Sequence, residues 1–363
     1  MKDPRIEKLA KGLLNHSIKL KKGESCLIAA DIGAKHLVIE LVRQIYKMGA
    51  FPFVRLGDDQ ISREVMMGMT PELSKKMLKN TMPTLEGCDT YISIRYNHNA
   101  FELSDVPGDI KVTHTKNYGK PVSDYIHKNI RWVLLNQPTV ADAQLAQMSH
   151  EAFTDFFYEV CTMDYSKMHK AMIPLKELLE KTDRVRIVDR DTDLTFSIKG
   201  QKSHICSGSH NIPDGEVFTS PILKSVNGKI KFNTPSLHKD VMHSDITLEF
   251  ADGKIINATS SNTKELITEI DSDEGAQFVG EFALGTNPYI KKPMNDTLFD
   301  EKIAGSIHLA LGKCIEEAPN GNKSQIHWDI VHMGGEIYFD DILIRKDGKF
   351  LTKELLPLNA TKF

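Results

Sequence analysis

The sequence FVGEFALGTNPYI (residues 278–290), followed by GSIHLALG (305–312) and SQIHWDI (324–330), contains three apolar, strand-like runs. Each run carries a side chain that can bind a metal: Glu281, then His308, then His327 with Asp329. A carboxylate or imidazole inside an apolar segment must be paired, hydrogen-bonded or metal-bound, because burying it without a partner is costly. The three runs therefore indicate a metal site built on neighbouring strands.

The alternation of side chains along a strand sets which of these groups share a face. His327 and Asp329 are two residues apart, so they point to the same face and can hold one ion, while Trp328 points to the opposite face. In the middle run, His308 shares its face with the small residue Ala310. An imidazole and a carboxylate side by side on a strand are less easily explained by solvation than either one alone.

A fourth segment, NIPDGEVFTSP (211–221), places Glu216 directly after a Pro-Asp-Gly turn. Gly280, next to Glu281, permits close approach of a neighbouring chain. Together the segments offer two imidazoles and three carboxylates, a suitable ligand set for two divalent ions that share a bridging carboxylate. Zinc, cobalt and manganese accept such mixed ligands, and a two-ion site can activate water and polarise a carbonyl.

Before residue 165, apolar strand-like runs alternate with helical patterns. The runs include SCLIAAD, FPFVRL, TYISIR, DIKVTH and RWVLLN, and the pattern between the first two has apolar residues at helical spacing. This alternation predicts an α/β domain over residues 1–165, with a largely parallel sheet covered by helices on both faces. The region has neither GxGxxG nor GxxxxGK[ST], so nucleotide binding would rest on fold analogy alone.

After residue 165 the pattern changes to short alternating runs separated by turns. Asn227-Gly228, Asp252-Gly253 and Asp347-Gly348 lie between such runs and are typical of hairpins. We therefore expect an α+β domain over residues 166–363, with mostly antiparallel strands that carry the metal site.

Composition excludes several functional classes. The net charge of −3 over 363 residues argues against a nucleic-acid-binding protein, which usually needs a basic face. No apolar run approaches the roughly 20 residues needed to cross a bilayer, and no export signal is visible. The five scattered cysteines, without a CxxC pair, suit a reducing cytoplasm.

The motifs NIPDGEVFTSP, GEFALGTNP, SIHLALG and SQIHWD, in this order and spacing, resemble the thermophilic-type metallo-aminopeptidase family that includes aminopeptidases T and S. The resemblance covers nearly the whole chain, beginning at DPRIEKLAKGLLNHSIKLKKGE. It implies a two-domain homodimer with an enclosed active site that removes N-terminal residues from short peptides.

Carried over to this sequence, the resemblance implies five metal ligands: Glu216, Glu281, His308, His327 and Asp329. The two glutamates are the candidate catalytic groups, and the sequence leaves open which carboxylate bridges the ions or acts as a base. The family commonly places a tyrosine seven residues after the first ligand histidine, where this chain has Ile315. Another group such as Tyr338 would then contact the substrate or oxyanion, or turnover would be slow.

Two other functions stay open at the level of sequence. His308, His327 and Asp329 could form the facial triad of a mononuclear iron(II) ring-cleaving dioxygenase, a distant relative of this peptidase fold. The substitution at Ile315 also suggests a non-catalytic member that keeps the fold as a binding or assembly module.

Overall fold

The computed structural model describes residues 3–239 and 241–363, and the chain divides into two compact units. The first unit runs up to Thr162 and also contains Gly208–Ile212, whereas the second contains Met163–Ser207 and Pro213–Phe363. We expected a single boundary at residue 165, whereas in the structure Gly208–Ile212 also belongs to the first unit. Among the described residues, no helix combines the length and apolar character needed to cross a membrane.

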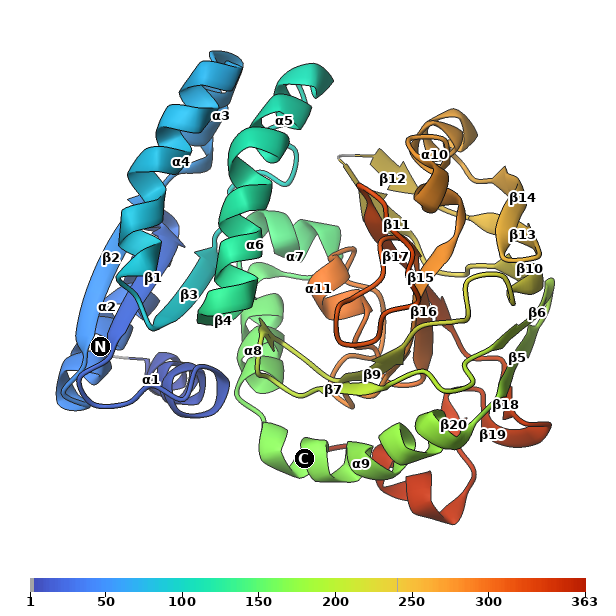
Figure 1. The fold of residues 1–363 in the computed structure, drawn as a ribbon. Coiled ribbons are helices and arrows are strands. Elements are labelled where there is room, and N and C mark those ends of the chain that lie inside the picture. Colours follow the sequence, from blue (N-terminus) through green and yellow to red (C-terminus); the bar gives the residue numbers. More distant parts are fainter. Residues whose placement is uncertain (1–2, 240) are drawn as a thin grey trace. The chain divides into compact units, whose positions relative to one another are not determined.

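The first unit is built on a parallel sheet, as predicted (Figure 1). All its neighbouring strands pair in parallel, in the order β2-β1-β3-β4-β8. The strands are β1 (Ser25–Asp31), β2 (Phe51–Gly57), β3 (Thr90–Arg95), β4 (Arg131–Asn136) and β8 (Asn211–Ile212). The chain leaves β1 toward β2 on one side and reaches β3 on the other, so the sheet changes winding direction between β1 and β3.

Helices surround this sheet, and local signals fix where they begin. Thr70 accepts a hydrogen bond from Leu73 N and Pro71 opens α4, an arrangement that satisfies the first helical turn. Leu27 of β1, Leu85 of α4 and Ile126 of α6 form one apolar cluster that joins sheet and helices. The helices are α1 (Pro4–Gly12), α2 (Lys35–Lys47), α3 (Asp59–Met67), α4 (Pro71–Glu86), α5 (Gly108–His114), α6 (Lys120–Asn129), α7 (Val140–Leu145) and α8 (His150–Cys161).

One predicted strand of this unit is wrong. The run DIKVTH is helical, as part of α5. Its apparent alternation rests on two residues, of which only Ile110 packs inward, against the cluster around Met66, whereas Val112 is exposed. Two apolar residues are too few to distinguish a strand period from a helix period.

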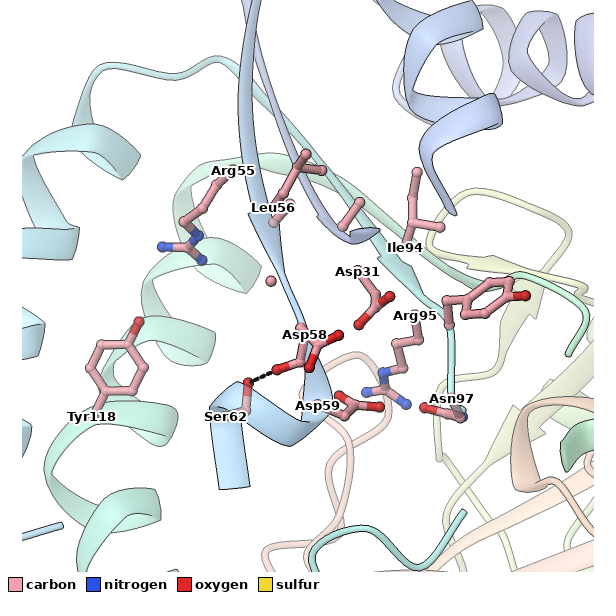
Figure 2. Close-up of a pocket in the computed structure, with 14 residues that line it drawn as sticks. Asp31, Arg55, Leu56, Asp58, Asp59, Ser62, Ile94, Arg95, Asn97 and Tyr118 are labelled. Atoms are coloured by element: carbon pink, nitrogen blue, oxygen red, sulfur yellow. Dashed lines mark hydrogen bonds between the residues drawn. The ribbon is translucent and has the colours of Figure 1, made fainter. Parts of the chain in front are cut away.

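A pocket of about 620 Å³ lies at the carboxyl ends of β1, β2 and β3 in this unit (Figure 2). Its wall includes Asp31 at the end of β1, Asp58 after β2 and Asn97 after β3. Ligands of open α/β sheets characteristically bind outside the carboxyl ends of the strands, at the point where the strand order reverses.

The second unit has mostly antiparallel strands, as predicted. An eight-stranded sheet has the order β14-β13-β10-β6-β5-β18-β19-β20, and a five-stranded sheet has the order β17-β16-β15-β9-β7. The strands of the larger sheet are β5 (Arg184–Asp189), β6 (Thr192–Ser197), β10 (Asn227–Lys231), β13 (Thr247–Ala251), β14 (Lys254–Thr259), β18 (Glu336–Phe339), β19 (Ile342–Lys346) and β20 (Lys349–Phe350). Those of the smaller sheet are β7 (His204–Cys206), β9 (Glu216–Thr219), β15 (Val279–Gly285), β16 (Ser306–Gly312) and β17 (His327–Met333).

The remaining elements of this unit are the pair β11 (Ser236–His238) and β12 (Val241–His243), with α9 (Tyr165–Lys181), α10 (Thr263–Ile270) and α11 (Thr297–Asp300). Two of the three predicted hairpin turns are confirmed: Asp252-Gly253 joins β13 to β14, and Asp347-Gly348 joins β19 to β20. The third prediction is wrong, because Asn227 and Gly228 begin β10 and pair with β6.

Candidate metal centre

The register of the five-stranded sheet gathers the predicted ligand side chains on one face. Ala310 of β16 lies opposite Glu281 of β15 on one side and opposite Asp329 of β17 on the other. Directly paired residues share a face of a sheet, so the two carboxylates flank a methyl group that leaves room between them. His308 and His327 lie two residues before Ala310 and Asp329, respectively, and project to the same face.

Glu216 joins this face from β9, where it pairs with Gly285 of β15. A bulge at Gly280 sets the phase of β15, and a Cβ there would lie 2.3 Å from the carbonyl oxygen of Gly312. The glycine is therefore required for close approach of the neighbouring backbone, as the sequence indicated.

The five side chains converge around Glu281. Its Oε1 lies 3.4 Å from His308 Nε2 and its Oε2 lies 3.3 Å from His327 Nε2. Asp329 Oδ1 lies 3.4 Å from His327 Nε2 and 3.8 Å from His308 Nε2, and Glu216 Oε2 lies 3.6 Å from His308 Nε2. Glu281 thus directs one oxygen toward each imidazole, an arrangement suited to a carboxylate that bridges two ions.

Unsatisfied buried atoms at this centre test whether it fits a metal. Within the described part of the chain, Glu216 Oε2 and Asp329 Oδ1 are buried without a hydrogen-bond partner. Such orphaned oxygens are rare in native proteins and call for a missing water or ion. His327 Nδ1 donates to the carbonyl of Lys313 at 2.7 Å, so Nε2, which faces the carboxylates, is the ring nitrogen available to a metal. The residues present therefore fit a divalent cation.

The electrostatics agree with a site for positive charge. Burial opposes protonation of His308, but the carboxylates of Glu281, Glu216 and Asp329 outweigh it and raise its pKa to about 9. Burial likewise opposes charge on His327, yet Asp329 and Glu281 hold its pKa well above the usual range. Without a metal the carboxylates thus favour protons on both imidazoles, because they need cationic partners.

Two charged residues at this centre, Lys302 and Glu301, were not predicted from the sequence. Lys302 is fully buried, and its Nζ lies 2.6 Å from Glu216 Oε1 and 2.6 Å from Glu301 Oε2. In the sequence, the run DEKI (300–303) has the composition of a solvent-exposed loop. The one signal that Lys302 is buried is its position shortly before the buried strand β16. Lys302 occupies one oxygen of Glu216 and leaves the other facing His308.

The position of the expected tyrosine is apolar. Ile315 packs against a cluster of Phe218, Ala283 and Ala318. Since Ala283 pairs with His308 on the face that carries the ligands, Ile315 lies beside the centre and supplies no hydrogen-bond donor there. Tyr338 lies on β18 of the other sheet, where its hydroxyl donates to Glu336 Oε2 at 2.5 Å.

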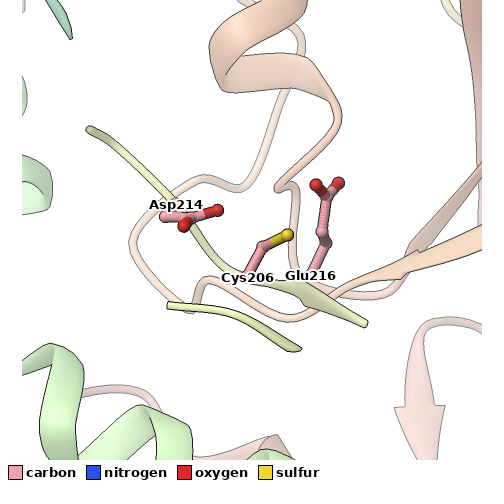
Figure 3. A group of neighbouring side chains, drawn as sticks. All are labelled: Cys206, Asp214 and Glu216. Atoms are coloured by element: carbon pink, nitrogen blue, oxygen red, sulfur yellow. The ribbon is translucent and has the colours of Figure 1, made fainter. Parts of the chain in front are cut away.

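A second group of ligand-type side chains, Cys206, Asp214 and Glu216, adjoins the centre through its shared glutamate (Figure 3). Burial raises the pKa of the Cys206 thiol well above its usual range, and the negative charges of Asp214 and Glu216 raise it further. Because the thiolate is the form of cysteine that binds metals, this shift makes the group less suited to a cation than the larger set around Glu281.

Comparison with known proteins agrees with this geometry. The family described as thermophilic metalloprotease (M29) matches residues 2–349. The chain is 25% identical to aminopeptidase 2 of Geobacillus stearothermophilus over 96% of this chain and 95% of that protein. It is 22% identical to aminopeptidase T of Thermus thermophilus over 88% of this chain and 87% of that protein.

A solved structure, wild-type AmpT from Thermus thermophilus, matches the fold with a TM-score of 0.82 and 18% identity, over 96% of this chain and 99% of that one. The family match spans both units and includes every predicted ligand. The chain belongs to the thermophilic metalloprotease (M29) family, whose members are metal-dependent hydrolases.

Proposed function

We propose that this protein is a metal-dependent aminopeptidase that hydrolyses the N-terminal peptide bond of short peptides at a centre of two divalent ions. The observation that carries the proposal is the convergence of two imidazoles and three carboxylates on one sheet face, with two buried carboxylate oxygens left unsatisfied. The names of the relatives, aminopeptidase 2 and aminopeptidase T, support the same reaction class.

In this proposal the ions would be held by Glu216, Glu281, His308, His327 and Asp329. Glu281 would be the carboxylate shared by both ions, since it faces both imidazoles. Two zinc, cobalt or manganese ions held there would activate water and polarise the scissile carbonyl. The chain's own contribution is to fix the ligands before the metal arrives.

Two contacts and one small side chain position these ligands. The Lys313 carbonyl orients the imidazole of His327, at 2.7 Å from Nδ1. Lys302 holds Glu216 by one oxygen, at 2.6 Å. Ala310 keeps the space between Glu281 and Asp329 open. Rigid placement of this kind lowers the entropic cost of binding metal and substrate.

The two alternative functions are less well supported. A mononuclear iron triad uses only His308, His327 and Asp329, and it leaves Glu281 without a role although this carboxylate faces both imidazoles. A non-catalytic module would not need unsatisfied carboxylate oxygens in its interior. The homodimer, the cytoplasmic location and a substrate contact from Tyr338 remain predictions.

The test is hydrolysis of a panel of aminoacyl-p-nitroanilides and dipeptides by the metal-loaded protein. We expect release of the N-terminal residue that stops on chelation and returns when zinc, cobalt or manganese is added. His327→Gln should abolish the reaction. His332→Gln is the matched control, because His332 lies on the opposite face of the same strand and contacts Asp189 instead. If none of the substrates shows metal-dependent release, the proposal is wrong.

A further inference from the structure

The pocket at the carboxyl ends of β1, β2 and β3 lies entirely within the first unit and takes no part in the metal centre. It lies where the strand order reverses, between β1 and β3, which is the position where open α/β sheets bind small molecules. A Cβ on Gly33 would lie 2.3 Å from the ring of Tyr96, so the turn after β1 packs tightly against the end of β3. The wall of the pocket is therefore well defined on this side.

Asp31 is the side chain in this pocket that indicates a bound ligand. It is only 9% exposed, and its Oδ1 accepts a hydrogen bond from Gly33 N at 2.7 Å. Its Oδ2 is buried, with no hydrogen-bond partner among residues 3–239 and 241–363. Figure 2 shows this carboxylate directed into the pocket, toward Asp58. A buried carboxylate oxygen without a partner is costly, so a donor or cation supplied by a ligand would relieve it.

The charges around Asp31 narrow the class of ligand. Burial raises the pKa of Asp59, and the neighbouring charges of Asp31 and Asp58 raise it further, so the three carboxylates repel one another. The same repulsion disfavours a phosphate and hence a phosphorylated nucleotide. A bare metal ion is also disfavoured, because the groups of converging ligand atoms in the described residues lie in the other unit. An ammonium group matches this part of the pocket.

The opposite charge is present in the same pocket. Arg95 lies beside Asn97 at the end of β3, and its guanidinium forms no ion pair with the described residues. Arg55 lines the pocket on the side of Tyr118 (Figure 2). Guanidinium groups bind carboxylates through two parallel hydrogen bonds. A ligand that carries both an ammonium and a carboxylate therefore fits the lining better than a ligand with one charge.

We propose that this pocket binds a zwitterionic α-amino acid or short peptide, with the ammonium on Asp31 and the carboxylate on Arg95 or Arg55. The proposal rests on the first unit alone and does not depend on the peptidase activity. If the peptidase proposal also holds, the pocket binds the same chemical class that the metal centre releases.

The test is calorimetric titration of the chelator-treated, full-length protein with leucine, N-acetylleucine, leucinamide and AMP. Leucine should bind, whereas N-acetylleucine, which lacks the ammonium, and leucinamide, which lacks the carboxylate, should bind at least about tenfold more weakly. Asp31→Asn should weaken leucine binding by a similar factor, and Asp109→Asn, an exposed aspartate of the same unit, should leave it unchanged.

Because Asp31 also accepts the Gly33 hydrogen bond, Arg95→Gln provides a second variant, at an exposed residue whose loss should not impair folding. It should weaken leucine binding and leave the thermal unfolding temperature unchanged. His327→Gln should bind leucine normally, since none of the proposed metal ligands lines the pocket. Three results would overturn the proposal: no leucine binding, binding lost in His327→Gln but kept in Asp31→Asn, or tighter binding of AMP than of leucine.

Discussion

Replacing Glu281 by glutamine tests the role of the carboxylate on which the metal centre converges. Glutamine keeps the shape of the side chain and removes its charge. In the structure, one oxygen of Glu281 lies 3.4 Å from His308 Nε2 and the other 3.3 Å from His327 Nε2. If the imidazoles hold one ion each, Glu281→Gln removes one anionic contact from both ions.

The magnitude follows from these two contacts. A contact that involves a charged group contributes about 1.5–3 kcal/mol, so the loss of two corresponds to about 3–6 kcal/mol. We expect the affinity for metal to fall by about two to four orders of magnitude, since each 1.4 kcal/mol is a factor of ten. The bound metal should then fall from two ions per chain to one or none.

The assay is a competition titration against a chelator of known affinity, followed by elemental analysis of the dialysed protein. Glu249→Gln is the matched control, because this glutamate also lies on a strand and its one ion-pair partner among residues 3–239 and 241–363 is Lys229, on the surface. It should retain the wild-type affinity and metal content. A Glu281→Gln protein that still holds two ions with unchanged affinity would refute the bridging role.

Three further predictions address the surroundings of the centre and the fold. Ile315→Tyr should raise kcat by about a hundredfold at unchanged metal content, because it introduces an oxyanion donor; an unchanged kcat in a folded variant would exclude that role. Lys302→Met should destabilise the metal-free protein by about 3–5 kcal/mol in urea unfolding, because it leaves Glu216 buried without its cation; a loss below 1 kcal/mol would contradict the buried pair. Burial opposes ionisation of Glu269, but the hydrogen bonds and charges of His238 and Lys239 outweigh this effect. They lower the pKa of Glu269 from 4.5 to about 2. Glu269→Gln should therefore cost at most about 3 kcal/mol above pH 4.5, and the difference from wild type should vanish as the pH falls toward 2; a constant difference across this range would contradict the ion pair.

The predictable part of the site is the part encoded by strand periodicity. The two-residue spacing of His327 and Asp329 places both on one face, and Trp328 lies on the other face, where its indole stacks on His238 at 4.2 Å between ring centroids. The small residue Ala310 beside His308 also signalled which face has room. These features depend only on the alternation of side chains along a single strand, so they can be predicted from the sequence.

The rest of the site depends on contacts between distant segments. Glu216 was expected from its motif and from the family resemblance and not from strand periodicity, because it reaches the centre through the pairing of β9 with β15, which has no local signature. Lys302 looks like a surface residue in the sequence, and its buried charge is compensated by two carboxylates, Glu216 and Glu301, which the sequence alone does not bring together. For the same reason the pocket at Asp31 was missed: it forms where three separate strands end.

The proposed centre holds two metal ions on the sheet face that carries Glu281. The most direct test is an anomalous diffraction map of crystals grown with saturating zinc, cobalt or manganese, combined with metal analysis of the same protein. We expect two peaks per chain, one beside His308 and one beside His327, with Glu281 between them. A single iron per chain accompanied by oxygen consumption, or no peak at saturating metal, would contradict the claim.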